Sequence, residues 1–208
     1  MHRPLRLTVD RAALVQNWRW LADRAGVPAG AAIKADAYGL GAREAMDALY
    51  GAGCRDFFVS VWSEAEELGP VPEEASLGVL HGVGADDLDA ALAGRARPVL
   101  NTVEQVVRWK QAASGKACDV MIDTGMNRLG LRPDEVAVLD GLDIDTLHSH
   151  LACADDPDHP KNDAQRSMFD RLRARLPKVP SSLANSPGML LGRAFFYDVV
   201  RPGIAIYG

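Results

Sequence analysis

Short apolar runs alternate with longer amphipathic stretches along this chain of 208 residues. Most of the runs are bounded by Gly, Pro, Asn or Asp, which is typical of buried β-strands. The pattern predicts eight strands, over residues 31–35, 56–61, 76–80, 97–101, 118–123, 145–151, 181–186 and 201–208.

The stretches between the runs carry apolar residues at helical spacing and hold residues that commonly begin or end helices. Asp10 is placed to cap the first predicted helix, and Gly26 is placed to end it. The segment TVEQ at 102–105 has the spacing of a capping box. Asn162 or Asp163 is placed to cap a later helix.

Strict alternation of strands and helices is typical of a parallel sheet joined by right-handed crossovers. Eight strands in 208 residues fit a small (β/α)8 TIM-type barrel, so we expect an α/β fold with one domain over residues 1–208. An open, doubly wound sheet is the alternative. It would more often carry a G-x-G-x-x-G turn after the first strand, and no such turn occurs there.

The composition is that of an ordinary soluble globular protein, and the net charge of −5 argues against nucleic acid as the main partner. Residues 1–14 lack an apolar stretch long enough for a signal peptide, and no segment is predicted to span a bilayer. The three cysteines, Cys54, Cys118 and Cys153, are odd in number and far apart, which indicates reduced thiols. These features predict a cytoplasmic protein.

Unusual polar residues gather at the carboxyl ends of the predicted strands, where a barrel builds its active site. They are Lys34 and Tyr38 after the first strand, Arg128 after the fifth, His148 and His150 in the sixth, Asn185 and Ser186 in the seventh, and Arg201 with Gly203 and Ile204 in the eighth. Each of them has a structural explanation by itself, such as a surface cation or a helix cap. Their convergence on one rim favours a functional site.

A metal site is the alternative suggested by His148 and His150, which are two residues apart and so share one face of a strand. No third ligand is obvious among the remaining histidines, which lie at the terminus or in predicted loops. The acidic segment 154–159 lacks the glycine-centred spacing of an EF-hand, so we expect a solvated loop there. The sequence therefore disfavours a metal.

Pyridoxal phosphate chemistry would use this set of residues, because a lysine amine can form a Schiff base with the aldehyde of the cofactor. Barrels often bind a phosphate at the loops after strands seven and eight. Ser186 and the amides around Gly203 and Ile204 suit that role, since glycine lets the backbone approach a phosphate closely. The set of residues at the rim is thus of the kind that pyridoxal 5'-phosphate catalysis requires.

Five segments resemble signature segments of the bacterial alanine racemases, in the same order and at about the same intervals. They are IKADAYGLG, DTGMNRLGL, SHLACADD, LANS and VRPGIAIYG. The resemblance implies a fold-type III pyridoxal phosphate enzyme that interconverts L- and D-alanine and supplies D-alanine for peptidoglycan. It also implies a homodimer for the full-length protein.

The resemblance assigns a role to each of the polar residues at the rim. The expected catalytic residues are Lys34, His150 and Arg201, and the expected cofactor contacts are Lys34, Tyr38, Arg128, Asn185, Ser186, Arg201, Gly203 and Ile204. Lys34 resembles the Schiff-base lysine, Arg128 the arginine on the phenolic oxygen, and Arg201 the arginine that faces the pyridine nitrogen. His150 resembles the histidine between that arginine and a second catalytic base.

The sequence departs from the family in three respects. The family's second base is a tyrosine of a C-terminal β-rich domain, supplied by the partner subunit, and no segment here matches that domain; Tyr50, Tyr197 and Tyr207 lie in no matching segment. Met121 stands where many members carry a carbamylated lysine, and Ser182 stands where some carry a histidine that extends the arginine network. We therefore expect a fragment that binds the cofactor weakly and racemises poorly.

Three other functions compete with this interpretation. A non-catalytic carrier of pyridoxal phosphate would also be a single barrel domain. A racemase of broader specificity, for serine or another amino acid, would share these segments. A metal-dependent barrel hydrolase would need more histidine ligands than the sequence offers.

Overall fold

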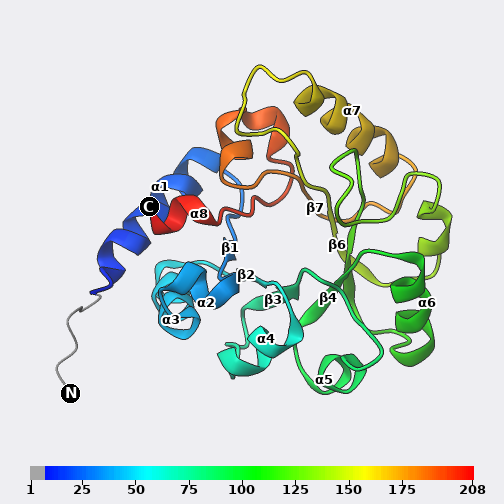
Figure 1. Ribbon diagram of the computed structural model, residues 1–208, viewed down its shortest axis with the longest axis horizontal. Coiled ribbons are helices and arrows are strands. Elements are labelled where there is room, and N and C mark those ends of the chain that lie inside the picture. The colour runs from blue at the N-terminus through cyan, green and yellow to red at the C-terminus, as the bar shows by residue number, and fades with distance from the viewer. Residues whose placement is uncertain (1–7) are drawn as a thin grey trace.

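Seven parallel strands form one sheet in the part of the chain that the structure, a computed structural model, describes, residues 8–208 (Figure 1). They are β1 (Ala31–Ala32), β2 (Asp56–Val59), β3 (Ser76–Val79), β4 (Arg97–Leu100), β5 (Cys118–Met121), β6 (Ile144–His148) and β7 (Ser181–Ser182). Their order in the sheet is their order along the chain. The first seven predicted strands are confirmed, although all are shorter than predicted.

The eighth position of the barrel is filled by the irregular segment 199–202 rather than by a regular strand. Val200 forms an isolated parallel bridge with Ala29, which precedes β1. On the other side, the Arg201 amide donates to the Ala184 carbonyl oxygen over 2.8 Å, just beyond β7. The segment thereby joins the two ends of the sheet, and the predicted α/β barrel of the TIM type is confirmed.

The predicted strand over residues 201–208 is wrong, because Ile204–Tyr207 form the short helix α8. Pro202 has no N–H group to donate to a strand ladder, so the pairing ends there. Gly203 then turns the chain with φ −132° and ψ −95°. The alternation that suggested a strand is equally compatible with one helical turn, in which Ile206 is buried and Ile204 is exposed.

Helices surround the sheet on its outer side (Figure 1). They are α1 (Arg11–Ala25), α2 (Lys34–Gly39), α3 (Ala42–Ala52), α4 (Trp62–Leu68), α5 (Leu88–Ala93), α6 (Val103–Ala112), α7 (Lys161–Arg173) and α8, with the 3-10 helices η1 (Val136–Leu139), η2 (Pro187–Leu190) and η3 (Arg193–Phe195). Within residues 8–208, none of these helices has the length and apolar character needed to cross a membrane. The prediction for the N-terminal 14 residues falls partly on residues 1–7, which lie outside the described chain.

The predicted ends of α1 and the start of α6 can be compared with the structure. Asp10 accepts hydrogen bonds from two amides of the first turn of α1, at 2.9 and 3.0 Å, and Gly26 ends the helix, as predicted. Thr102 accepts from the Gln105 amide over 3.3 Å. The Gln105 side chain accepts from the Asn101 amide over 2.8 Å, so only half of the predicted capping box forms.

The predicted cap of α7 is wrong, because the helix begins at Lys161 and both Asn162 and Asp163 lie in its first turn. Pro160 occupies the N-cap position, where its ring-fixed φ of −63° suits the entry into a helix. Asn162 is buried, and its Nδ2 donates to the Asp156 carbonyl oxygen over 2.9 Å. The side-chain amide of Asn162 therefore holds the preceding loop and does not cap the helix.

Apolar side chains between the sheet and the helices form the core. The largest fully buried ones include Trp109, Phe57, Phe169, Met46 and Leu77. Every residue of β5 is buried, as expected where helices cover one face of a strand and the barrel interior covers the other. The three cysteines are free, and burial raises the pKa of the Cys54 and Cys118 thiols to about 12, so both stay protonated.

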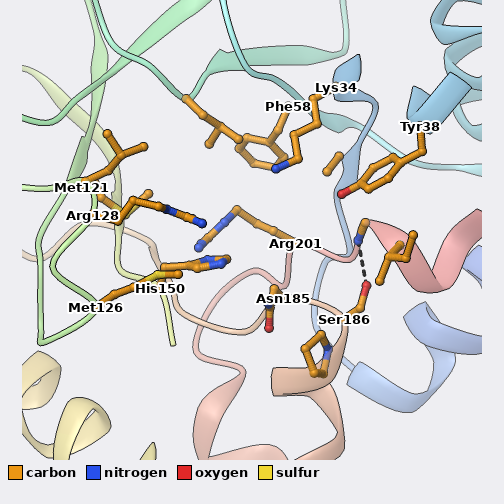
Figure 2. A pocket seen from close by; sticks show the side chains of 16 residues that line it. Lys34, Tyr38, Phe58, Met121, Met126, Arg128, His150, Asn185, Ser186 and Arg201 are labelled. Atoms are coloured by element: carbon orange, nitrogen blue, oxygen red, sulfur yellow. Dashed lines mark hydrogen bonds between the residues drawn. The ribbon is translucent and has the colours of Figure 1, made fainter. Parts of the chain in front are cut away.

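A left-handed helical turn follows β1 directly. The φ angles of residues 35–38 lie between 51° and 56°, a region that costs roughly 1–2 kcal/mol for each residue with a Cβ. The predicted strand over 31–35 therefore ends early, at Ala32, and Lys34 is the first residue of α2. The turn places Lys34 and Tyr38 on the inner side of the rim (Figure 2).

Two carboxylates hold this turn by accepting hydrogen bonds from the backbone. Glu64, on α4, accepts from the Ala35 amide over 2.7 Å and from the Ser60 amide over 2.6 Å. Asp36 accepts from the Ala42 amide over 2.7 Å at the start of α3. Hydrogen bonds to a charged acceptor are stronger than neutral ones, so these contacts offset part of the cost of the left-handed conformation.

We expect Glu64→Gln to lower the free energy of unfolding by about 1–3 kcal/mol. An amide has one acceptor oxygen where the carboxylate has two, so one of the two backbone amides loses its partner. Urea denaturation measures the change. The matched control is Glu66→Gln, an exposed residue of the same helix, for which we expect a change within about 0.5 kcal/mol. Equal stability of Glu64→Gln and the parent chain would contradict this role.

Candidate functional site

All nine residues predicted to form the site line one cavity at the carboxyl ends of the strands (Figure 2). They are Lys34, Tyr38, Arg128, His150, Asn185, Ser186, Arg201, Gly203 and Ile204. The rest of the lining is apolar, with Ala32, Phe58, Leu80, Met121, Met126, Leu129 and Pro187. The cavity holds about 790 Å³ of space, partly open to solvent, which is ample for a cofactor-sized molecule.

The parallel topology explains why these residues meet. Because neighbouring strands run in the same direction, their carboxyl ends form one rim, and the residues that follow each end face a common centre. Lys34 lies two residues beyond β1, His150 two beyond β6 and Asn185 three beyond β7. Residues more than 150 positions apart in the chain are thus brought together.

Three cations line the cavity, namely Lys34, Arg128 and Arg201. No carboxylate does so within the described residues. Cationic groups in a concave, partly apolar site create a positive potential that attracts anions. The cavity is therefore suited to a molecule that carries phosphate, phenolate or carboxylate groups.

His150 lies among these cations and is held in its neutral form. Burial lowers the pKa of its imidazole to about 3, and the positive charges of Arg201, Arg128 and Lys34 add to that effect. A neutral imidazole has one donor and one acceptor nitrogen. His150 can therefore pass a hydrogen bond along the cavity wall without adding a fourth positive charge.

Arg201 is buried and is fixed by two hydrogen bonds on the closing side of the barrel. Its Nη1 lies 2.9 Å from His148 Nδ1, and its Nη2 donates to the Ser149 carbonyl oxygen over 2.6 Å. Burial lowers the pKa of the guanidinium to about 10, so the group remains charged near pH 7. In the described residues, the histidine that hydrogen-bonds Arg201 is His148, whereas the resemblance assigned that contact to His150.

The hydroxyl of Ser182 does not extend the arginine network. It donates to the Val199 carbonyl oxygen over 2.6 Å. Ser182 is the direct partner of His148 in the register of β6 and β7. Where some family members carry a histidine, this chain has Ser182, and a different histidine, His148, lies opposite it on β6. The sequence had suggested a metal-binding role for His148.

Ser186 and Gly203 meet beside Tyr38 at one end of the cavity. Ser186 Oγ accepts from the amides of Gly203 over 2.8 Å and Ala205 over 3.3 Å, which leaves the hydroxyl proton free to donate to an anion. A Cβ at Gly203 would collide with the Tyr38 hydroxyl, so this close approach requires glycine. The Gly203 amide, which we predict to lie beside a phosphate, donates to Ser186 in this structure.

Asn185 has two roles, one at the start of a helix and one in the cavity wall. Its Oδ1 accepts from the Gly188 amide over 3.0 Å and so helps to start η2, as expected for a helix-capping residue. The same residue lines the cavity. Both descriptions of Asn185 therefore apply.

Arg128 is carried by a loop that Asp123 organises. The Asp123 carboxylate accepts from the amides of residues 125–127 at 2.8–3.1 Å. The loop closes at Gly130, whose φ is 117° and where a Cβ would lie 2.5 Å from the Asp123 nitrogen. Met121 lies in the floor of the cavity, so this position contributes no charge to the orientation of Arg128.

A buried glutamine that the sequence analysis missed ties two rim loops together. Gln165, on α7, donates to the His150 carbonyl oxygen over 2.9 Å and to Thr124 Oγ1 over 3.3 Å. Its Oε1 accepts from the Ala152 amide over 2.8 Å. A polar residue on the buried face of a helix was the available signal.

Neither histidine of the HSH segment is arranged for a metal. The two ring nitrogens of His148 face Arg201 and Asp119. Among residues 8–208, no group of three or more His, Cys, Asp or Glu side chains is placed to share an ion. The contacts of the arginine site thus account for His148.

The fold and the site together define a class of protein, a (β/α)8-type barrel whose rim holds an amine beside two arginines in a cavity for a small anionic molecule. Residues 9–208 match the family model described as "Alanine racemase, N-terminal domain". The chain belongs to this family.

Relatives and solved structures agree with this assignment. The chain is 42% identical to the alanine racemase of Rhizobium meliloti (strain 1021), covering 98% of this chain and 56% of that protein. It is 44% identical to the alanine racemase of Brucella suis, covering 97% of this chain and 54% of that protein. The chain therefore spans little more than half the length of these relatives.

Two crystal structures share the fold over nearly the whole chain. The alanine racemase from Bartonella henselae with covalently bound pyridoxal phosphate gives a TM-score of 0.91 at 37% identity, covering 96% of this chain and 62% of that one. The biosynthetic alanine racemase from Pseudomonas aeruginosa gives 0.87 at 32% identity, covering 96% and 58%.

We expect the free energy of unfolding to fall as the pH is lowered from about 6.5, the ordinary pKa of histidine, toward 3. The folded-state pKa of His150 lies below its unfolded value, so the unfolded chain binds the proton first and gains stability as the pH falls. Urea denaturation at pH 7 and pH 5 measures the slope.

The control is His150→Gln, in which we expect a smaller loss of stability between pH 7 and pH 5. Heteronuclear NMR of the imidazole nitrogens identifies the His150 signals by their absence in this variant. A protonated His150 ring in the folded chain at pH 5 would contradict the environment described here.

Proposed function

We propose that residues 1–208 form the cofactor-binding barrel domain of a pyridoxal 5'-phosphate-dependent alanine racemase, an isomerase that interconverts L- and D-alanine. The observation that carries the proposal is the cavity, in which one lysine and two arginines face an interior without a carboxylate among the described residues. The names of the relatives and the cofactor in the Bartonella henselae structure support it.

The residues present fit the cofactor. A phosphate would bind beside Ser186, which has a free hydroxyl proton, with Tyr38, Gly203 and Ile204 around it. Arg128 and Arg201 would then face the ring, and Asn185 would complete the wall. When bound, pyridoxal phosphate supplies an aldehyde that bonds covalently to an amine and an electron-accepting ring that makes the α-proton of an amino acid acidic.

Lys34, Arg201 and His150 supply the proton transfer, the positive charge and the hydrogen bonding at the site. Lys34 supplies the attachment and moves a proton to or from the α-carbon on one side of the substrate. Arg201 presents a fixed positive charge, since an arginine does not give up its proton under these conditions. His150 stays neutral, so its imidazole has one nitrogen to donate and one to accept a hydrogen bond.

Racemisation needs an acid/base group on each face of the α-carbon, and we infer that the second group comes from outside the described barrel. Tyr38 is the one tyrosine that lines the cavity within residues 8–208. Tyr207 donates to the Ala32 carbonyl oxygen and Tyr197 to Asp170, each over 2.8 Å, so both hydroxyls are engaged elsewhere. Lys34 then serves one face alone.

The same proposal includes the substrate, the oligomeric state, the location and the physiological role of the enzyme. We infer alanine as the substrate, a homodimer for the full-length protein, a cytoplasmic location and the supply of D-alanine for the cell wall. The names of the relatives favour this function over the carrier, over a racemase of broader specificity and over a metal-dependent hydrolase.

Addition of pyridoxal phosphate to the purified chain is expected to produce a visible absorption band that Lys34→Ala abolishes. Borohydride reduction followed by peptide mass mapping is expected to place the adduct on Lys34. Lys178→Ala, an exposed lysine near the opposite end of the barrel, is the control and is expected to keep the band. A band that survives in Lys34→Ala would overturn the assignment.

With the cofactor bound, we expect the chain to exchange the α-proton of one alanine enantiomer with D₂O faster than it inverts the centre. A single proton-transfer group returns deuterium to the face from which the proton left. Proton NMR measures the exchange, and a chiral assay measures the inversion. Inversion as fast as exchange would show that the barrel alone supplies both groups.

A further inference from the structure

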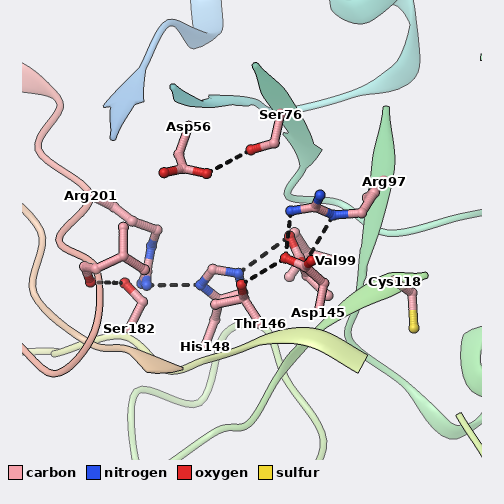
Figure 3. A network of polar contacts seen from close by, with 12 residues as sticks. Asp56, Ser76, Arg97, Val99, Cys118, Asp145, Thr146, His148, Ser182 and Arg201 are labelled. Carbon is pink, nitrogen blue, oxygen red and sulfur yellow. Dashed lines mark hydrogen bonds and ion pairs between the residues drawn. The ribbon is translucent and has the colours of Figure 1, made fainter. Parts of the chain in front are cut away.

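A chain of polar side chains crosses the barrel interior behind the cavity (Figure 3). It runs from Arg201 to His148, then to Asp119, and from there to Arg97 and Asp145. The interior of such a barrel is ordinarily filled with branched apolar residues. A buried carboxylate and a buried imidazole at this place therefore need a reason.

The contact between Arg201 and His148 fixes the tautomer of the histidine. An arginine can only donate, so His148 Nδ1 must accept the hydrogen bond of 2.9 Å from Arg201 Nη1. The neutral imidazole then carries its proton on Nε2. That nitrogen faces Asp119 Oδ2 at 3.5 Å.

The groups that surround His148 keep it neutral. Burial lowers the pKa of its imidazole, as do the charges of Arg201 and Arg97, while Asp119 raises it. The rings of His148 and Phe58 pack edge to face, with their centroids 5.8 Å apart. The neighbour of His148 on β2 is therefore apolar. His148 thus lies between the Arg201 cation and the Asp119 anion and is itself uncharged.

Asp119 is anchored at the far side of the barrel from the cavity. It is 1% exposed, and Oδ1 lies 3.4 Å from Arg97 Nε. Arg97 in turn pairs with Asp145 over 2.8 Å, at the amino-terminal ends of β4 and β6. The carboxylate is therefore held in place by a cation other than Arg201.

We propose that His148, whose other ring nitrogen faces Asp119, is a positioning residue that orients Arg201 toward the cavity, an inference that rests on the proposed function. A carboxylate in direct contact with Arg201 would cancel much of its positive charge. A neutral imidazole supplies an acceptor and leaves that charge directed at the bound molecule. Two of the five N–H groups of Arg201 are fixed by His148 and Ser149, and the others remain for the cavity.

The first part of the test compares three variants of the purified chain. His148→Leu removes the acceptor and keeps most of the volume, while His148→Gln keeps an acceptor oxygen near Nη1. Ser182→Ala is the matched control, because Ser182 is the register partner of His148 and bonds only to backbone. Circular dichroism establishes that each variant is folded.

Titration with pyridoxal phosphate is the first readout. We expect His148→Leu to weaken binding about tenfold and to shift the visible band, whereas His148→Gln and Ser182→Ala stay within about threefold of the parent chain. A folded His148→Leu chain with unchanged affinity and an unchanged band would overturn the inference. Failure of the parent chain to show a Lys34-dependent band would instead overturn the proposed function.

NMR of the arginine side-chain nitrogens is the second readout and needs no cofactor. Hindered rotation of a held guanidinium gives separate Nη signals, and we expect these signals from Arg201 to be present in the parent chain and in His148→Gln. They should merge or broaden in Asp119→Asn, which removes the charge behind His148, and in His148→Leu. Retention of fixed Arg201 signals in both of these variants would contradict the positioning role, even if His148→Leu proved too unstable for titration.

Discussion

Closure of the barrel by residues 199–202 is the constraint on which the site depends. This segment bonds to β1 on one side and to the residues after β7 on the other, although it is too irregular to be a strand. It also carries Arg201 and leads directly to Gly203 and Ile204. The hydrogen bonds that complete the fold therefore also place three cavity residues, so fold and site cannot vary independently here.

The cavity is assembled at an electrostatic cost. Burial, together with the charges of three nearby cations, lowers the pKa of His150 to about 3. These three cations share one space without a carboxylate from the described residues, so they repel one another. A molecule with negative groups would relieve that repulsion and would bind the folded chain in preference to the unfolded one. Affinity for an anion and reduced stability of the empty barrel thus have the same origin.

The sequence predicted the seven strands and nine of the residues that line the cavity, because strand ends and polar exceptions are local signals. It failed where the outcome depends on distant contacts. Residues 201–208 alternate like a strand, yet Pro202 stops the ladder and Gly203 turns the chain. The left-handed turn after β1 depends in part on Glu64, about 30 positions away, which accepts from the Ala35 amide of the turn. The partner of Arg201 likewise follows from the register of β6 on β7, which periodicity does not specify.

Two departures from the local rules of folding concern the groups around and behind the cavity. Non-glycine residues adopt positive φ at 35–38, and charged groups lie inside the barrel at Asp119 and Arg201. Well-packed apolar side chains are often as stabilising as a buried ion pair, so stability alone does not explain the polar interior. What an apolar interior would not provide is a fixed direction for the Arg201 charge. Both exceptions lie at or behind the rim that carries Lys34. They therefore indicate that the barrel is less stable than an apolar one would be and that the groups around Lys34 are oriented as a result.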